Sequence, residues 1–588
     1  MLEVRTPARR VLAGGGAGLA LLAAAAWPSP QAPPARAATA AAQGPTTLDR
    51  TIVAKGERDL AYGGGEPRIT RHLDWPHGRG GGRALAGFKH LSDVHVIDEE
   101  SPARVEWMDA CTVPELGTQD EADKGVTGAY RVHESLSTQV GDAMLRRLAA
   151  ITRGPATNVP LSFAISTGDN ADNNQVNETR WFVDLLDGEV VDPNSGARSY
   201  DGYTREQFAD ALDLETLELA QQPFDAIGTK IPWYAVLGNH DGLAQGNAPG
   251  FPFESIAVGG RKVFIAIEGY SNCPDGPDDL QGLQDIVTAA LSNSSREVPA
   301  DPARHFMTHD ELVEQYFDTT GKPVGHGLAR APQDPMFGSR AGYYSFPIAP
   351  KIRGISLDTI AYAGGDDGHI PDPQFRWLEE ELLKWSRVYL DPTGAHARNP
   401  GGKDRMIVLF SHHSSPKLAN PGVDPAGAPY HCFRRTDQPE CADGEGLDGL
   451  LKRFPNVIAW VNGHEHNNAV RRFPAAAGQD PDRGYWELNT AAHIDWPQQA
   501  RLIEIAWKPG RGRRADTVFI YGTVVDHAAA PDPDRARQSP IAYLASLSRV
   551  EAYYDACVRT AQAKCIASGR PKDRNVKLVQ KAPFDLGR

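Results

Sequence analysis

The sequence predicts an α/β fold, because short apolar segments alternate with stretches that have helical periodicity. The apolar segments have the length and composition of buried strands. They are residues 86–91, 161–166, 233–237, 406–410 and 457–461. Residues 135–151 and 374–389 are expected to be helices, and Phe375, Leu378 and Leu382 share one face of the second. In such folds ligands bind beyond the carboxyl ends of the strands, so the loops after these segments are where a site is expected.

Composition limits the classes of function. The chain has 588 residues, of which 41% are hydrophobic and 23% charged, enough for one large core or two ordinary ones. The formal net charge of -14 argues against a general nucleic-acid binder, which normally presents a basic surface. We therefore expect no nucleic-acid partner. The oligomeric state is left open.

The N-terminus has the pattern of a twin-arginine export signal. Arg9 and Arg10 precede an uncharged, Ala-rich and Leu-rich stretch at 11–27, and small residues at 35–37 offer a cleavage site. We expect residues 1–37 to be removed and the mature protein to be periplasmic, bound to the cell wall or secreted, with no stable membrane anchor. A single membrane anchor is the alternative, although four glycines interrupt the apolar run.

Export makes the six cysteines interpretable, because disulfides persist outside the cytosol. Two pairs are close enough in the sequence to close small loops, and the remaining two cysteines are candidates for a long-range pair. The local pairs are Cys432 with Cys441 and Cys557 with Cys565, and the long-range candidates are Cys111 and Cys273. Spacing alone does not fix the connectivity.

Each predicted strand is followed by a loop rich in Asp, Asn and His. The clusters are SDVHV (Asp93, His95), STGDNADN (Asp169), LGNHD (Asn239, His240, Asp241), FSHHSS (His412, His413) and NGHEH (His464, His466). One such residue in a loop is most often a cap or a solvated side chain. Five clusters in the same structural position indicate one site. Mixed oxygen and nitrogen donors of this kind suit Mn, Fe and Zn.

In order and spacing, the clusters resemble the five motifs DxH, GD, GNHD, H and GHxH of the calcineurin-like metallophosphoesterases. The resemblance covers roughly residues 85–501. It implies a four-layer α/β/β/α sandwich and a binuclear centre of two divalent or mixed-valence ions, with Mn, Fe or Zn preferred. Such a centre hydrolyses phosphate esters by activating a water between two cations.

The resemblance also implies a ligand set. Asp169 bridges the cations, and the other ligands divide between them. Asp93, His95 and His466 complete one coordination shell, while Asn239, His412 and His464 complete the other. In NGHEH, residues two apart on an extended segment project to the same side, so we expect this segment to be extended.

Other residues are expected around these ligands. The resemblance implies that His240 faces the substrate as a phosphate contact or proton donor, and we expect Asp241 to orient it. Of the two adjacent histidines we favour His412 as the ligand. Candidate contacts with substrate are His413, Asn170, Asn173 and His493, although turn formation is an alternative for the asparagines and packing for His493.

The rest of the chain surrounds a catalytic domain at 85–501. We expect an N-terminal extension at 38–84 and strands and a helix at 502–588. A long insertion at 242–350 follows GNHD, and it is either a lid over the site or a surface insertion.

Three functions compete. The favoured one is a phosphodiesterase or phosphomonoesterase that acts on a small-molecule phosphate ester outside the cytoplasmic membrane. The alternative is a nucleotide phosphoanhydride hydrolase or 5'-nucleotidase-like enzyme with the same centre. A non-catalytic metallated scaffold is least favoured, because His240 and every expected ligand are present.

Overall fold

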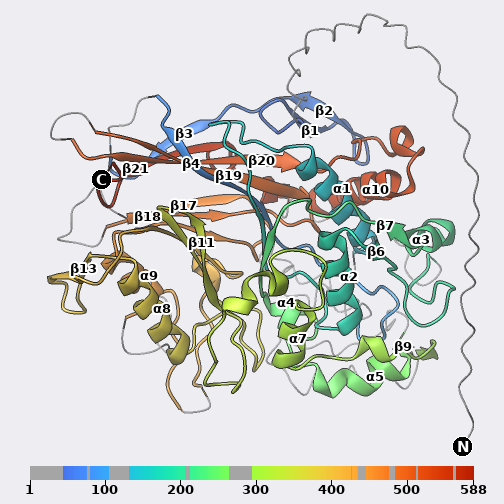
Figure 1. Cartoon of the computed structure of the whole chain (residues 1–588). Coiled ribbons are helices and arrows are strands. Elements are labelled where there is room, and N and C mark those ends of the chain that lie inside the picture. The colour runs from blue at the N-terminus through green and yellow to red at the C-terminus, as the bar shows by residue number, and fades with distance from the viewer. Residues whose placement is uncertain are drawn as a thin grey trace, which may run out of the picture. The chain divides into compact units, whose positions relative to one another are not determined.

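Two β-sheets carry the fold and pack face to face (Figure 1). The first, in spatial order, consists of β3 (Ile69–His72), β21 (Val576–Lys581), β20 (Thr517–Asp526), β19 (Gln499–Lys508), β4 (Arg83–Leu91), β5 (Ala164–Thr167) and β8 (Trp233–Val236). The second consists of β11 (Tyr344–Ala349), β12 (Ile352–Ser356), β15 (Met406–Phe410), β16 (Val457–Asn462), β18 (Gly484–Asn489) and β17 (Ala469–Pro474).

The structure is a computed structural model, and it describes one unit of the chain. The described residues are 44–75, 80–104, 131–205, 212–263, 295–424, 427–434, 441, 445–475, 484–510, 514–559 and 565–587. The predicted export signal at 1–37 therefore lies outside them. Among the described residues, no helix combines the length and apolar character needed to cross a membrane.

The middle of each sheet is parallel. In the first sheet β4, β5 and β8 run parallel, and in the second β12, β15, β16 and β18 do. Antiparallel strands flank both parallel groups. The carboxyl ends of neighbouring parallel strands therefore meet at one edge of each sheet, as the sequence pattern required.

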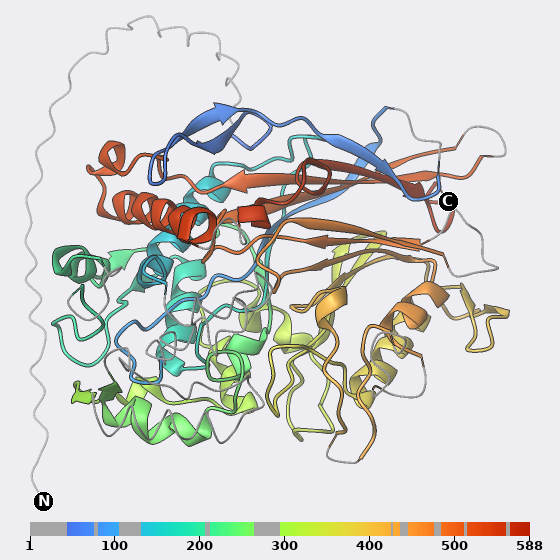
Figure 2. The ribbon, with the colours of Figure 1, turned by 180° about the vertical axis from the view of Figure 1, so that it is seen from behind.

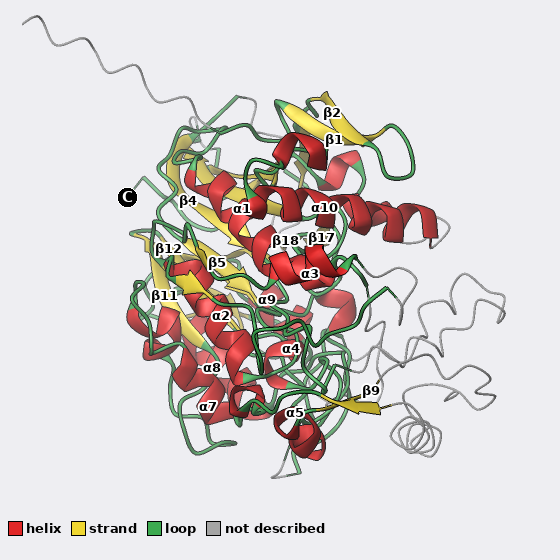
Figure 3. Cartoon of the chain, turned by 90° about the vertical axis from the view of Figure 1, so that its right-hand side faces the viewer, coloured by secondary structure: helices red, strands yellow, loops and turns green. Residues whose placement is uncertain are grey.

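Side chains that alternate along the strands build the core. On β15, Phe410 faces the first sheet, where its ring lies 5.7 Å from that of Phe88. Ile407 and Leu409 face the other way and pack against helices α8 (Asp372–Lys384) and α9 (Leu447–Arg453). Helices α1 (Ser137–Ala149) and α2 (Val176–Asp187) pack into the core shared by the two sheets (Figure 3).

The predicted mixed α/β fold is confirmed, with five strands and two helices close to their expected positions. One helix is shorter than expected. The segment predicted as helix at 374–389 leaves the helix after Lys384, because Val388–Leu390 (β13) pairs instead with His396–Arg398 (β14). The four-layer order of the sandwich stays a prediction.

The C-terminal region is part of the first sheet. β19 pairs with β4 from Arg501 opposite His90 to Trp507 opposite Arg83, so the predicted domain boundary at 501 falls inside a strand. β20, β21 and β3 extend this sheet, and helix α10 (Pro540–Tyr554) contacts α1 (Figure 2). The strands and the helix expected at 502–588 are present, and these strands supply much of the first sheet.

The remaining elements are short and lie mainly outside the sheets. They are the hairpin β1 (Arg50–Ala54) and β2 (Leu60–Gly64), the pair β6 (Val190–Val191) and β7 (Phe224–Asp225), helices α3 (Leu214–Ala220), α4 (Asn239–Gly242), α5 (Glu254–Gly259) and α7 (His309–Gln315), and the pair β9 (Arg261–Val263) and β10 (Ser295–Glu297). β11 lies within the predicted insertion at 242–350, so the end of that segment belongs to the second sheet.

Two disulfides close small loops. Cys432 is bonded to Cys441 and Cys557 to Cys565, which confirms both local pairs. The candidate pair of Cys111 and Cys273 lies outside the described residues.

Candidate metal centre

The predicted ligands all follow the carboxyl ends of parallel strands. Asp93 and His95 follow β4, Asp169 follows β5, Asn239 opens α4 directly after β8, His412 follows β15, and His464 and His466 follow β16. Three strand ends come from one sheet and two from the other. The loops of both sheets therefore converge on one place, where five of these side chains are buried and His464 and His466 are half-buried.

The backbone at these positions is unusual. Asp93, His95, Asp169, His464 and His466 all have positive φ, between 46° and 71°. Residues other than glycine rarely adopt this left-handed conformation, and such strain concentrates at functional sites. The segment NGHEH is therefore not extended, and that expectation was wrong. Its two histidines reach the site from a bend.

One group of donor atoms matches the first predicted coordination shell. Asp93, His95, Asp169 and His466 each offer an atom within 4.8 Å of the others. His95 Nε2 lies 3.6 Å from Asp169 Oδ2, and His466 Nε2 lies 3.4 Å from Asp93 Oδ1. A cation accepted by this group would have two carboxylates and two imidazoles as ligands.

A second group adjoins the first through Asp169. His412 Nε2 lies 3.0 Å from Asp169 Oδ2 and 3.1 Å from His464 Nδ1. Asn239 donates its side-chain amide to Gly246 O at 3.0 Å, while its Oδ1 is buried without a hydrogen-bond partner among the described residues. The same carboxylate oxygen of Asp169 thus faces imidazoles of both groups.

Hydrogen bonds at Nδ1 turn the Nε2 atoms of three imidazoles inward. His95 Nδ1 is bonded to Asp172 at 2.8 Å and His466 Nδ1 to Asp495 at 2.6 Å. His412 Nδ1 is bonded to the carbonyl of Thr167 at 2.9 Å. Since a carbonyl or carboxylate accepts the proton on Nδ1, the lone pair remains on Nε2, where a metal would bind.

Asp172 and Asp495 were missed in the sequence. Asp172 lies three residues after Asp169 in the run STGDNADN, so a signal was present, but nothing distinguished it from a turn-forming aspartate. Asp495 lies 29 residues from the histidine it orients. Only the fold brings that pair together.

His413 differs from its neighbour. Its Nδ1 is bonded to the hydroxyl of Thr359 at 2.7 Å and its Nε2 to the carbonyl of Asp366 at 2.9 Å. Because both ring nitrogens already have partners, no lone pair is left for a cation or a substrate. The geometry favours His412 as the ligand of the two.

His240 is partly exposed, with 22% of its side chain accessible, close to the 23% of His466. Its Nδ1 is bonded to the carbonyl of Asp172 at 2.6 Å, and its ring lies edge-on to His95, 4.5 Å away. Burial lowers the pKa of His240, but Asp169 and Asp172 outweigh it and raise the pKa to about 9. These two carboxylates therefore favour the protonated ring.

Asp241 does not orient His240, contrary to expectation. Its carboxylate accepts hydrogen bonds from the backbone amides of Gly238, Asn170 and Ala171. It therefore ties the loop after β5 to the loop after β8. Burial raises the pKa of Asp241 to about 7.

Three candidate substrate contacts are buried and bonded to the loops around them, while Asn173 Nδ2 and His493 Nε2 have no hydrogen-bond partner in the described part of the chain. Asn170 accepts a bond from Ser166 and donates to Val236 O, and Asn173 Oδ1 accepts the amide of Gln245 at 2.8 Å. His493 is bonded to Ser92 O at 2.8 Å. Asn170, Asn173 and His493 are each at most 1% exposed. Their side chains therefore support the loops of the site and do not line its rim.

The donor set fits two cations. The buried Nε2 of His95 and Oδ1 of Asn239 lack partners in the described part of the chain, which is costly unless something binds them. Burial raises the pKa of Asp169, but His412, His240 and His95 outweigh it and hold the pKa well below its usual range. The carboxylate is thus ionised and able to bind metal. The identity of the metals stays a prediction.

Comparison with known proteins agrees with this geometry. No family model matches the chain. It is 23% identical over 141 residues to the glycerophosphodiester phosphodiesterase GpdQ of Enterobacter lignolyticus (strain SCF1), a match covering 23% of this chain and 42% of that protein. This match, which spans less than half of the relative, and the grouped donor atoms agree with the resemblance to the calcineurin-like metallophosphoesterases.

Two solved structures are distant neighbours of this chain. A dimetal phosphatase from Danio rerio has a TM-score of 0.27 and 11% identity, covering 76% of this chain and 99% of its own. PhoD has a TM-score of 0.28 and 11% identity, covering 80% of this chain and 73% of its own. Both scores are low, so these structures add nothing to the assignment.

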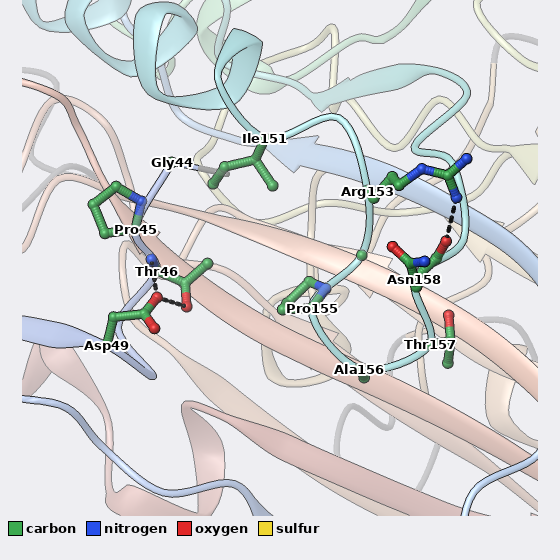
Figure 4. Close-up of a pocket in the computed structure, with 11 residues that line it drawn as sticks. Gly44, Pro45, Thr46, Asp49, Ile151, Arg153, Pro155, Ala156, Thr157 and Asn158 are labelled. Atoms are coloured by element: carbon green, nitrogen blue, oxygen red, sulfur yellow. Dashed lines mark hydrogen bonds between the residues drawn. The ribbon is translucent and has the colours of Figure 1, made fainter. Parts of the chain in front are cut away.

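The protein also has a cavity that none of the predicted site residues line. It measures about 590 Å³ and lies between the segment around Thr46 and the loop that follows α1 (Figure 4). In its wall, Asp49 accepts bonds from Thr46, and Arg153 donates to Asn158 O at 2.6 Å. These polar groups are hydrogen-bonded within the wall of the cavity. We assign no function to the cavity.

Proposed function

We propose that this protein hydrolyses phosphate esters, either diesters or monoesters, at a centre of two cations. The observation that carries the proposal is the position of Asp169. Its Oδ2 lies 3.6 Å from His95 Nε2 and 3.0 Å from His412 Nε2, so one carboxylate serves both groups of donors. GpdQ, a phosphodiesterase, supports the same reaction class.

Asp93, His95 and His466 would hold one cation, Asn239, His412 and His464 the other, and Asp169 both. Two bound cations supply Lewis acidity toward the phosphate oxygens and lower the pKa of a water near neutral pH. The chain's own part is to hold the ligands. The backbone amide of His240 donates to Asp169 Oδ1 at 2.9 Å, and that of His464 to Asp93 Oδ1 at 2.9 Å. These bonds fix both carboxylates before any cation binds.

His240 would act on the substrate. Its ring is held by the carbonyl of Asp172, and 22% of its side chain is exposed. As a cation it attracts the phosphate, and it can release a proton to the departing oxygen. General acid catalysis of this kind is typically worth about 10² to 10⁴ in rate.

Access to His240 is shaped by the start of the 242–350 segment. Gln245 donates to Asp172 at 2.9 Å, and Gly246 approaches the ring of His240 closely. We propose that this segment forms one wall of the substrate site. We therefore propose that the start of this segment supports His240 from the side of the site, in place of a lid that covers it.

We propose that the protein acts outside the cytoplasmic membrane after twin-arginine export. Arg9 and Arg10 support the export route, and the two disulfides support an oxidising compartment. The substrate would then be a small phosphate ester met there. The phosphoanhydride alternative uses the same centre, and no observation favours it.

The proposal is tested with protein freed of metal by a chelator. Adding Mn²⁺, Zn²⁺, Fe²⁺ or Co²⁺ singly should restore hydrolysis of bis(p-nitrophenyl) phosphate or p-nitrophenyl phosphate, with two metal ions bound per chain. The ratio of the two rates separates diesterase from monoesterase. Two bound ions without turnover on any ester or anhydride would support the scaffold instead.

The role of His240 has its own test. His240→Ala should keep both cations, while kcat falls by about 10² to 10⁴ for an alkyl ester and less for a nitrophenyl ester, whose leaving group hardly needs a proton. His305→Ala is the matched control, because His305 is an exposed histidine bonded to Glu254. Equal losses on both esters would leave His240 as an electrostatic contact only.

A further inference from the structure

Behind the first group of donors lies a chain of five charged side chains with alternating sign. They are Asp172, Arg104, Glu134, Arg131 and Asp495. Their side chains are between 1% and 19% exposed. No single element carries them. They come from the loops after β4 and β5, the turn before α1 and the loop before β19.

Each link of this charged chain is a direct contact. Arg104 donates to Asp172 Oδ2 at 3.0 Å and to Glu134 Oε2 at 2.9 Å. Arg131 Nε lies 2.5 Å from Glu134 Oε1. Its Nη1 lies 2.7 Å and 2.6 Å from the two carboxylate oxygens of Asp495. Glu134 is the central member, held between two guanidinium groups.

Both ends of the charged chain reach a predicted ligand of the same cation. Asp172 is bonded to His95 Nδ1 at 2.8 Å, and Asp495 to His466 Nδ1 at 2.6 Å. The charged chain therefore connects His95 with His466 on the side away from the cation, and a cation bound by both imidazoles would connect them on the other side. Neither the second group of donors nor Asn239 has a contact with these five charges in the described residues.

We propose that Glu134 is a positioning residue for one cation of the pair, acting through Arg104 and Arg131 on the carboxylates that orient His95 and His466. This inference rests on the proposed two-cation centre. The physical reason is that the arginines and the imidazoles compete as hydrogen-bond donors for the carboxylates of Asp172 and Asp495. While Glu134 shares the guanidinium groups, Asp172 and Asp495 keep enough negative charge to accept strongly from the two imidazoles, and the imidazoles remain good donors to a metal.

Removing the charge of Glu134 changes that balance. Both arginines would then pair more strongly with the aspartates, and the hydrogen bonds to His95 and His466 would weaken. Loss of such outer contacts typically costs about 10-fold to 100-fold in metal affinity. Since the second group lacks this support, only one of the two cations should be affected.

The test measures cation binding and not hydrolysis. Metal-free Glu134→Gln protein is titrated with Mn²⁺ alone by equilibrium dialysis. We expect one site with wild-type affinity and one weakened by about 10-fold to 100-fold. Glu134→Asp, which keeps the charge, should recover most of the loss. Glu445→Gln is the matched control, because Glu445 also pairs with a buried arginine, Arg453, at 2.8 Å.

Each other outcome overturns the inference. Unchanged affinity at both sites would show that Glu134 does not support the centre, and an equal loss at both sites with lower thermal stability would show a merely structural role. If Glu134→Gln does not fold, Arg131→Lys breaks the same chain at a more exposed side chain, because lysine lacks the fork that contacts two carboxylates. The same loss at one site is then required. Wild-type protein that binds no cation pair would instead refute the proposed function.

Discussion

Gly246 offers a sharp test of how the loop after GNHD supports His240. Its φ is +67°, in the left-handed region. A Cβ added there would lie 2.3 Å from His240 Cδ2, 2.5 Å from His240 Nε2 and 2.5 Å from Asn239 Nδ2. Carbon atoms in contact are normally about 3.5 to 4.0 Å apart, so the ring must move by on the order of 1 Å.

Gly246→Ala should therefore have two separable effects. The left-handed backbone costs alanine about 1 to 2 kcal/mol of folding stability. The displaced ring should lower kcat by about 10²-fold, the loss that a misplacement of about 1 Å can cause at a catalytic group. Urea unfolding measures the first effect and turnover of an alkyl phosphate ester the second. Metal analysis shows whether Asn239 has also moved.

The control is Gly338→Ala. Gly338 has φ of +70° but nothing within 4 Å of an added Cβ, so it carries the backbone cost without the clash. Both variants should lose similar stability, and only Gly246→Ala should lose turnover. A Gly246→Ala enzyme with kcat within threefold of the Gly338→Ala enzyme would refute the view that this wall positions His240.

Three further expectations follow from other parts of the chain. Asp169→Asn should release bound metal and nearly abolish hydrolysis, since it removes the carboxylate facing both donor groups; two retained ions with most activity would contradict the ligand set. Replacing Arg9 and Arg10 by Lys should leave precursor in the cytosol, as cell fractionation would detect, and normal export would exclude the twin-arginine route. Burial lowers the pKa of Lys89 from 10.5 to about 8, so the folded protein binds fewer protons between these values and its stability rises with pH through that window. Lys89→Met should thus stabilise metal-free protein by on the order of 3 kcal/mol at pH 7. Urea unfolding should show that this gain in stability becomes smaller above pH 10. An equal gain at both pH values would exclude the charge of Lys89 as its cause.

The grouping of the predicted ligands could be foreseen because their signal is local. Each lies just after an apolar strand, and the carboxyl ends of parallel strands must meet. Asp93 and His412 come from different sheets, yet each is identifiable from its own strand and loop. The same reasoning places His240 in the site, since it follows Asn239 directly.

The residues that orient the ligands were not predictable in this way. Asp495 and Asp172 are aspartates in loops, and their value depends on which imidazole the fold brings to them. Asp241 was assigned by its neighbour in sequence, but its carboxylate serves the amides of another loop. For the same reason the boundary predicted at 501 falls inside β19, because the pairing of β19 with β4 joins residues about 400 positions apart.

The strained backbone of the ligands has a cause that the sequence does not display. Left-handed residues other than glycine persist only where the surroundings over-determine them. Here the amide of Asp93 donates to Gly168 O at 3.1 Å and that of His95 to Asp169 O at 2.9 Å, so the loops after β4 and β5 hold each other. The amide of His493 in turn donates to Asp93 O at 3.0 Å. These contacts involve only backbone groups of the chain itself. The ligand positions are therefore set by the joining of neighbouring strand ends, and a cation would meet a site that is already formed.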